Sequence, residues 1–204
     1  MRRMIEPIVG QLRRPNGPLA PVTAAVLNVV NRPINRWAVG ALRLTGDEEV
    51  LDVGFGGGVG LALVLARLPA GRVTGIDISE EMVQRGASRF RPEMAERRVR
   101  LLRAGVEAMP FAESSFDRAY TVNTIFFWPD VAAGLRELHR VLRPGGRLVI
   151  AAPPSGFRLA SWFRLSQDPL VDGIEQARDM ALAAGFGDAR TVRRAGATLL
   201  VATK

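Results

Sequence analysis

The sequence of 204 residues contains no cysteine and only one histidine, His139. Without cysteine, the chain cannot form a disulfide framework, a cysteine-ligated zinc or iron–sulfur site, or a thiol nucleophile. A single histidine also excludes a histidine-rich metal site, so we expect no metal centre. We expect His139 itself to be a solvated surface residue rather than a catalytic one.

Long apolar runs are also absent: none approaches the ~20 residues that a membrane-spanning helix needs. The first seven residues, MRRMIEP, carry charge but lead into no long apolar stretch, unlike a secretory signal. We therefore expect a cytoplasmic protein without a transmembrane segment. The fractions of hydrophobic (48%) and charged (24%) residues are typical of a globular protein, and the length fits one domain.

Lysine is nearly absent, because every basic residue except Lys204 is an arginine. The formal net charge of +8 raises the possibility of nucleic-acid binding. The arginines are spread from Arg2 to Arg194, however, which favours a solvated basic surface, and we expect no nucleic-acid partner.

Predicted strands and helices alternate from residue 48 onward, as judged by apolar periodicity and turn signals. The predicted strands cover residues 49–53, 72–77, 99–103, 116–123, 147–152, 189–194 and 198–203. The predicted helices cover residues 58–68, 80–90, 130–142 and 168–184. This order implies crossover connections and an α/β fold of the Rossmann-like, doubly wound type, with a mostly parallel sheet and helices on both faces. The last two strands would form an antiparallel hairpin.

A glycine-rich loop, DVGFGGGVG at residues 52–60, follows the first predicted strand. Ligands of doubly wound sheets bind beyond the carboxyl ends of the strands. Glycines let a ligand approach the backbone, and the next helix presents its N-terminal N–H groups. Asp77 ends the second predicted strand, where a carboxylate can accept hydrogen bonds from both hydroxyls of an adenosine ribose.

Two common phosphate-binding patterns do not fit this loop. The dinucleotide fingerprint G-x-G-x-x-G fails in both registers, because Val59 or Leu61 stands where the third glycine is required. A P-loop needs G-K-[ST], and the one lysine of the chain is its last residue. The loop therefore indicates neither a dehydrogenase nor a P-loop nucleotidase.

Four segments instead match one family in order and spacing: VLDVGFGGG at 50–58, GIDIS at 75–79, EAMPF at 107–111 with SFD at 115–117, and LRPGGRL at 142–148. In these segments the chain resembles the class I S-adenosylmethionine-dependent methyltransferases. It is most similar to the small-molecule branch that includes the quinone-biosynthesis methyltransferases. The resemblance covers about residues 48–152. It implies a seven-stranded sheet whose last strand is antiparallel, in agreement with the predicted hairpin, and S-adenosyl-L-methionine as the cofactor.

The resemblance also implies a set of cofactor-binding residues. They are Asp52, Gly54, Phe55, Gly56, Gly58, Asp77, Ile78, Val106, Glu107 and Asn123. The glycines would lie under the methionine part of the cofactor, and Asp52 would hold its amino group directly or through water. Asp77 would bind the ribose diol, and Ile78 would pack against adenine.

One position departs from the family pattern. Relatives often carry an acidic residue two places before the glutamate of the EAMPF segment, and this chain has Gly105 there. Adenine would then rely on backbone groups near Val106 and on Glu107. Asn123, at the end of the fourth predicted strand, either touches the cofactor or substrate or only closes the strand.

The expected organisation is a single methyltransferase domain over residues 1–204. Within it we expect a helical N-terminal cap at 1–45, a cofactor-binding core at 46–152, a substrate-side insert at 153–167, and a C-terminal helix and hairpin at 168–204. Both the cap and the insert are rich in apolar residues. We expect them to close over a largely apolar acceptor cavity, with Phe126 and Trp162 as substrate-contacting residues. The alternative is that both segments only cover the sheet or form a dimer contact.

The expected reaction is methyl transfer from S-adenosylmethionine to a small, partly apolar acceptor. No general base is evident, so no catalytic residue is predicted, and the sequence does not predict the oligomeric state. A cofactor-binding module without catalysis, acting as a partner subunit or regulator, is the alternative. Methylation of nucleic acid is disfavoured, because the residues from Asn123 onward are N-T-I-F and not N-P-P-Y.

Overall fold

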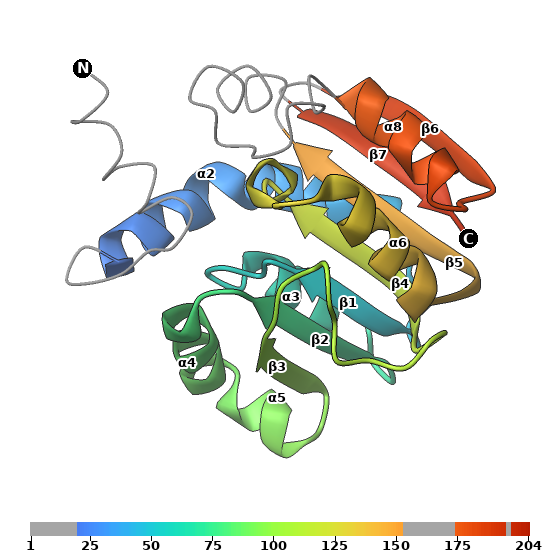
Figure 1. The fold of residues 1–204 in the computed structure, drawn as a ribbon. Coiled ribbons are helices and arrows are strands. Elements are labelled where there is room, and N and C mark those ends of the chain that lie inside the picture. Colours follow the sequence, from blue (N-terminus) through green and yellow to red (C-terminus); the bar gives the residue numbers. More distant parts are fainter. Residues whose placement is uncertain (1–19, 153–173, 195–196) are drawn as a thin grey trace, which may run out of the picture.

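The computed structural model describes residues 20–152, 174–194 and 197–204, with residues 20–30 described by their backbone alone. In this part of the chain seven strands form one sheet in the order β3-β2-β1-β4-β5-β7-β6 (Figure 1). The strands are β1 Glu49–Val53, β2 Arg72–Asp77, β3 Val99–Arg103, β4 Phe116–Val122, β5 Leu142–Ala152, β6 Asp188–Arg194 and β7 Ala197–Thr203. Strands β1 to β5 pair in parallel, whereas β7 is antiparallel to both of its neighbours. The predicted mostly parallel sheet with a C-terminal hairpin is confirmed.

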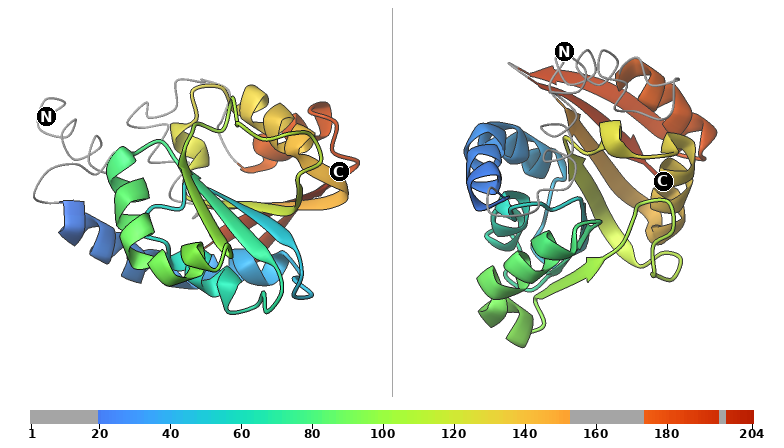
Figure 2. Two further views of the ribbon diagram at one scale, coloured as in Figure 1. Left: turned by 90° about the horizontal axis from the view of Figure 1, so that it is seen from below. Right: turned by 60° about the vertical axis from the view of Figure 1, so that its left-hand side comes forward.

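Helices cover both faces of this sheet, as the doubly wound prediction requires. The helices are α2 Ala20–Ala41, α3 Val59–Leu65, α4 Glu80–Arg89, α5 Arg91–Ala95, α6 Val131–Val141 and α8 Ile174–Ala183, with a 3-10 turn η1 at Ile125–Phe127. Helices α2 and α3 lie on one face, and α6 and α8 lie on the other (Figure 2). None of the described helices is long and apolar enough to cross a membrane.

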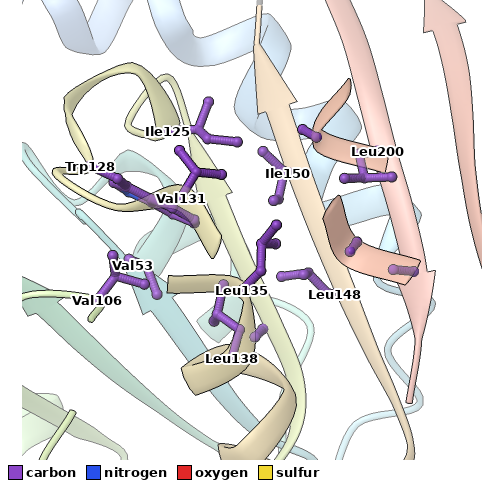
Figure 3. Close-up of a cluster of buried hydrophobic side chains, with 14 of the residues drawn as sticks. Val53, Val106, Ile125, Trp128, Val131, Leu135, Leu138, Leu148, Ile150 and Leu200 are labelled. Carbon is purple, nitrogen blue, oxygen red and sulfur yellow. The ribbon is translucent and has the colours of Figure 1, made fainter. Parts of the chain in front are cut away.

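Alternation of side chains along the strands divides the core into two clusters. Leu51 and Val53 of β1 point toward α6 and α8 and belong to one cluster with Leu135 and Leu138. Figure 3 shows Val53 together with these two leucines of α6. Val50 points to the opposite face, into the cluster beneath α2 and α3. Because successive residues of a strand alternate, Asp52 lies on the same face as Val50, with its carboxylate on the α2 and α3 side.

The structure differs from the prediction at the start of β5, which begins at Leu142 and not at residue 147. The pairing with β4 starts at Phe116 and Leu142 and shifts in register before Arg118 and Arg147. Gly145 lies in this irregular stretch with a positive φ of 75°. The predicted Pro-Gly-Gly turn is therefore a kink within a long strand, because backbone hydrogen bonds with Lys204 hold it in the sheet.

Two further local features differ from the prediction. His139 is half-buried and not solvated: its ring packs edge-on against Phe186 at 5.2 Å, and burial lowers its pKa. The short helix α5 was not predicted, although Pro92 in its first turn is a common helix-start signal.

Other expectations fall on residues that the structure does not describe. The insert at 153–167, including Trp162, lies outside the described residues, as do residues 1–19 of the expected N-terminal cap. Within the described residues, no group of three or more histidine, aspartate or glutamate side chains is arranged to hold a metal ion.

Candidate active site

The glycine loop turns sharply between β1 and α3. Gly54, Gly56 and Gly58 all have positive φ angles, of 74°, 50° and 75°. The Gly54 N–H donates to the carbonyl oxygen of Ile76 at 2.7 Å, which fixes the loop to the tip of β2. Left-handed backbone of this kind favours glycine, because a Cβ atom would crowd the following carbonyl group.

The space around the three glycines differs, and this difference marks where a ligand can approach. A Cβ atom on Gly54 would collide with the side chain of Thr124, and one on Gly58 would lie 2.6 Å from the ring of Phe90. A Cβ atom on Gly56 would meet no atom of the described residues within 4 Å. Gly54 and Gly58 are thus packed against protein, whereas Gly56 borders open space.

Asp77, at the end of β2, is held by the backbone of two loops. Its Oδ2 accepts a hydrogen bond from the Gly56 N–H at 3.0 Å, and its Oδ1 accepts one from the Ser79 N–H at 2.9 Å. Burial raises the pKa of Asp77, against the lowering effect of these backbone donors. The carboxylate therefore ties the tip of β2 to the glycine loop, with Gly56 at the point of contact.

Asp52, on β1, forms a buried pair with Tyr120 of β4. The two residues are directly opposite each other in the parallel register, and the Tyr120 hydroxyl donates to Oδ2 of Asp52. Burial raises the pKa of Asp52 to about 7; the Tyr120 hydrogen bond opposes this shift and the nearby charge of Asp77 adds to it. Burial and the adjacent carboxylate also raise the pKa of Tyr120, so its hydroxyl remains a proton donor.

Gly60, in the first turn of α3, packs directly over this pair. A Cβ atom there would lie 2.6 Å from the Tyr120 hydroxyl, 2.9 Å from Oδ1 of Asn35 and 3.0 Å from Oδ2 of Asp52. Because Asn35 belongs to α2, the four elements α2, α3, β1 and β4 meet at this point. The close approach leaves no room for a side chain at residue 60.

The segment after β3 lies beside the tip of β2, because the Ala104 N–H donates to the carbonyl oxygen of Asp77 at 3.1 Å. The Glu107 carboxylate folds back over Gly105: its Oε2 is 3.1 Å from the place where a Cβ on Gly105 would stand. Its Oε1 is buried and has no hydrogen-bond partner among the described residues. Val106, by contrast, points into the core and packs against Gly134.

Asn123 follows β4 and adopts a positive φ of 62°, which is uncommon for any residue other than glycine. Its backbone N–H donates to the carbonyl oxygen of Ala151 at 2.9 Å. Its Nδ2 donates to Oδ1 of Asn31 on α2 at 2.8 Å, and its own Oδ1 is buried without a partner in the described chain. The next residue, Thr124, touches Gly54, so the end of β4 adjoins the glycine loop.

The structure thus brings most of the expected site residues to one edge of the sheet. The glycine loop and Asp77 are in direct contact, and Asp52 and the end of β4 adjoin them. Two further expected residues are buried: the Phe55 ring packs between Gly75 and Gly86 in the core, and Phe126 is only 5% exposed.

Sequence reasoning missed several residues of this edge, namely Asn31, Asn35, Tyr120 and Thr124. For Tyr120 there was one signal, since it is the only tyrosine of the chain and stands in a predicted strand. Its contact with Asp52 depends on the register between β1 and β4, which a single sequence does not contain.

Comparison with known proteins gives matches to methyltransferases. Residues 51–150 match the family described as "Methyltransferase domain". A methyltransferase of Bacillus subtilis is 31% identical over 133 residues, which cover 65% of this chain and 71% of that protein. The ubiquinone/menaquinone biosynthesis C-methyltransferase of Geotalea daltonii is 36% identical over 122 residues, but this match covers 59% of this chain and only 52% of that protein.

A solved structure shares the fold at lower identity. Geranyl diphosphate methyltransferase, determined in complex with S-adenosylmethionine, superposes with a TM-score of 0.66 at 16% identity, covering 93% of this chain and 92% of that one. At this identity the likeness concerns the fold alone. The family match and the Bacillus relative identify the family. The chain belongs to the class I S-adenosylmethionine-dependent methyltransferases.

Proposed function

We propose that the protein transfers a methyl group from S-adenosylmethionine to a small, partly apolar acceptor. The observation that carries this proposal is the contact between Asp77 and the glycine loop at Gly56, the loop residue that borders open space. A ligand can reach the backbone there and meet a carboxylate at the same time. A ribose with two free hydroxyls fits this combination, because carboxylate oxygens accept hydrogen bonds from hydroxyl groups.

The other carboxylates of this sheet edge are the proposed partners for the rest of the cofactor. Asp52, which lies beneath Gly60 of α3, would accept a hydrogen bond from the cofactor's amino group. Glu107 has a buried Oε1 that lacks a hydrogen-bond partner among the described residues, and this oxygen would accept a hydrogen bond from the adenine amino group. Ile78 is half-buried next to Asp77 and would supply an apolar contact to adenine, with the backbone near Val106 as a further partner.

S-adenosylmethionine, when bound, supplies a methyl group on a positively charged sulfur, and the remaining thioether is a neutral leaving group. Such a transfer needs no acid to assist departure, so the chain can act by aligning the acceptor and excluding water. We place the acceptor at the end of β4, beside Asn123 and Thr124. Phe126 would support this corner from within the core, and Trp162 stays a predicted acceptor contact.

The test measures cofactor binding and turnover separately. Calorimetry with S-adenosylhomocysteine should give saturable binding, and Asp77→Ala should weaken it at least ~10-fold, since a hydrogen bond to a charged group contributes ~1.5–3 kcal/mol. Asp179→Ala is the matched control, because it removes a carboxylate on α8 that is 64% exposed. Unchanged affinity in Asp77→Ala would contradict the proposed ribose contact.

A turnover assay then distinguishes an enzyme from a cofactor-binding module without catalysis. The protein should convert S-adenosylmethionine to S-adenosylhomocysteine when supplied with a small-molecule extract, and the methylated product should appear in the organic phase. Binding without turnover in any extract would favour the cofactor-binding module. Methylation of added RNA or DNA in place of the extract would overturn the small-molecule assignment.

A further inference from the structure

Tyr120 has no role in the proposed cofactor contacts, although it is the only tyrosine of the chain and is 1% exposed. We infer that Tyr120 is a positioning residue, which holds the Asp52 carboxylate ready for the α-ammonium group of the cofactor. This inference rests on the proposed function, because Asp52 is the proposed partner of that ammonium group. It adds a residue from β4 to the recognition of the methionine end.

The geometry leaves one carboxylate oxygen for the ligand. The Tyr120 hydroxyl donates to Oδ2 of Asp52, and within the described residues no hydrogen bond reaches Oδ1. Gly60 packs against the Tyr120 hydroxyl, since a Cβ atom on Gly60 would lie 2.6 Å from the hydroxyl oxygen. The carboxylate is thus fixed through one oxygen while the other stays available.

The charges around Asp52 explain why this hydrogen bond matters. Among the described residues, the titratable groups that face Asp52 are Tyr120 from β4 and Asp77 from β2. Helices α2 and α3 contribute Asn35 and Gly60, which carry no charge. No arginine or lysine of the described chain stabilises the ionised carboxylate. A buried carboxylate without a cation is costly, so an incoming ammonium group is strongly favoured, provided that the carboxylate is ionised.

Tyr120 keeps Asp52 closer to that ionised state. Burial raises the pKa of Asp52 to about 7, and the Tyr120 hydrogen bond acts in the opposite direction. Removing the hydroxyl would raise the pKa of Asp52 further. Ligands with an ammonium group should therefore bind more tightly as pH rises through neutrality, and without Tyr120 this increase should occur at higher pH.

The experiment compares two ligands that differ at the methionine end. S-adenosylhomocysteine carries the α-ammonium group, whereas 5′-methylthioadenosine has the same adenosine part but no amino-acid part. In Tyr120→Phe, affinity for S-adenosylhomocysteine at pH 7 should fall about tenfold, while affinity for methylthioadenosine should stay within about twofold. The pH profile for S-adenosylhomocysteine should also move to higher pH. Thr198→Val, which removes a buried hydroxyl from β7, is the control and should change neither ligand.

Gly60→Ala provides a second variant, because its methyl group would push the hydroxyl away from Asp52. It should reproduce the selective loss of S-adenosylhomocysteine binding. Binding of methylthioadenosine reports that a variant is folded, and if Tyr120→Phe does not bind it, Gly60→Ala carries the same comparison. Equal losses for both ligands, or an unmoved pH profile, would overturn the inference. Failure of the unmodified protein to bind either ligand would instead contradict the proposed function.

Discussion

Nδ2 of Asn123, directly after β4, donates a hydrogen bond to Oδ1 of Asn31 on α2, with 2.8 Å between the two atoms. The residues are 92 positions apart in the sequence. Asn31 is also tied to its own helix, since Nδ2 of Asn35 donates to its carbonyl oxygen at 2.9 Å. Helix α2 therefore reaches the sheet edge at which we place the acceptor, through a polar contact and not only through apolar packing.

Two substitutions at Asn123 separate the role of its backbone from that of its side chain. Asn123→Ala and Asn123→Gly both remove the hydrogen bond to Asn31, but only glycine adopts a φ of 62° without cost. We expect Asn123→Ala to be less stable than Asn123→Gly by ~1–2 kcal/mol in urea unfolding. Turnover should fall to a similar level in both, because both lack the amide. Equal stability of the two variants would show that the positive φ is not strained.

The fold could be predicted from the sequence to a large extent because its signals are local. The alternation of Leu51 and Val53 with Val50 and Asp52, and the turn residues after each strand, need no knowledge of distant contacts. The errors occur where distant residues decide the outcome. The strand β5 extends back to Leu142 because its backbone pairs with Phe116 and Lys204, and His139 is half-buried because Phe186 packs on it.

The glycines of the loop should respond differently to the same small change. In Gly56→Ala the new methyl group faces open space, so we expect a folded protein with the ~1–2 kcal/mol cost of a left-handed alanine. Its affinity for S-adenosylhomocysteine should nevertheless fall at least ~10-fold, because the methyl group would occupy space that the ligand needs. Calorimetry and circular dichroism on the same sample test both statements.

Gly58→Ala is the matched comparison, since its φ is also positive but its methyl group would meet the ring of Phe90. This variant should lose more stability than Gly56→Ala, as measured by thermal unfolding. Normal cofactor affinity in Gly56→Ala would show that the loop does not approach the ligand.

Asp52 should reduce the stability of the free protein as pH rises. Its pKa is raised to about 7 in the folded protein from an ordinary value of 3.8, so folding disfavours the ionised form. The contribution of protonated Asp52 to the free energy of unfolding is fully present below pH ~4, and it is lost as pH rises through 7. In Asp52→Asn this loss is absent. The free energy of unfolding, measured in urea, should therefore rise in the variant relative to the unmodified protein by ~2 kcal/mol between pH 5 and pH 8.

The same variant should bind S-adenosylhomocysteine more weakly, because an amide does not carry the charge that an ammonium group requires. Stability and ligand binding would then change in opposite directions. A difference in stability between the two proteins that does not depend on pH would contradict the raised pKa of Asp52.

The proposed site could be predicted only in part from the sequence. Asp77 and the glycines stand directly after predicted strands, and the ends of parallel strands meet at one edge of a sheet. Tyr120 is 68 residues from Asp52, and the hydrogen bond between them needs the β1–β4 register. The order of strands and loops in the sequence indicates which residues lie near a ligand. The partners that influence the pKa of these residues, such as Tyr120 for Asp52, come from other strands and cannot be identified in this way.

Glu107 provides the last prediction, because its Oε1 is buried without a hydrogen-bond donor among the described residues. An unsatisfied buried polar group costs ~1–3 kcal/mol, and the adenine amino group would remove that cost. The unmodified protein should therefore bind 5′-methylthioadenosine at least ~10-fold more tightly than 5′-methylthioinosine, which has a carbonyl in place of the amino group. In Glu107→Ala this ratio should approach one, whereas Glu113→Ala, at an exposed position, should retain it. Because the preference is a ratio for one protein, a general loss of stability would not imitate the result. An unchanged ratio in Glu107→Ala would mean that another group recognises adenine and that the carboxylate over Gly105 does not replace the missing acid of the family.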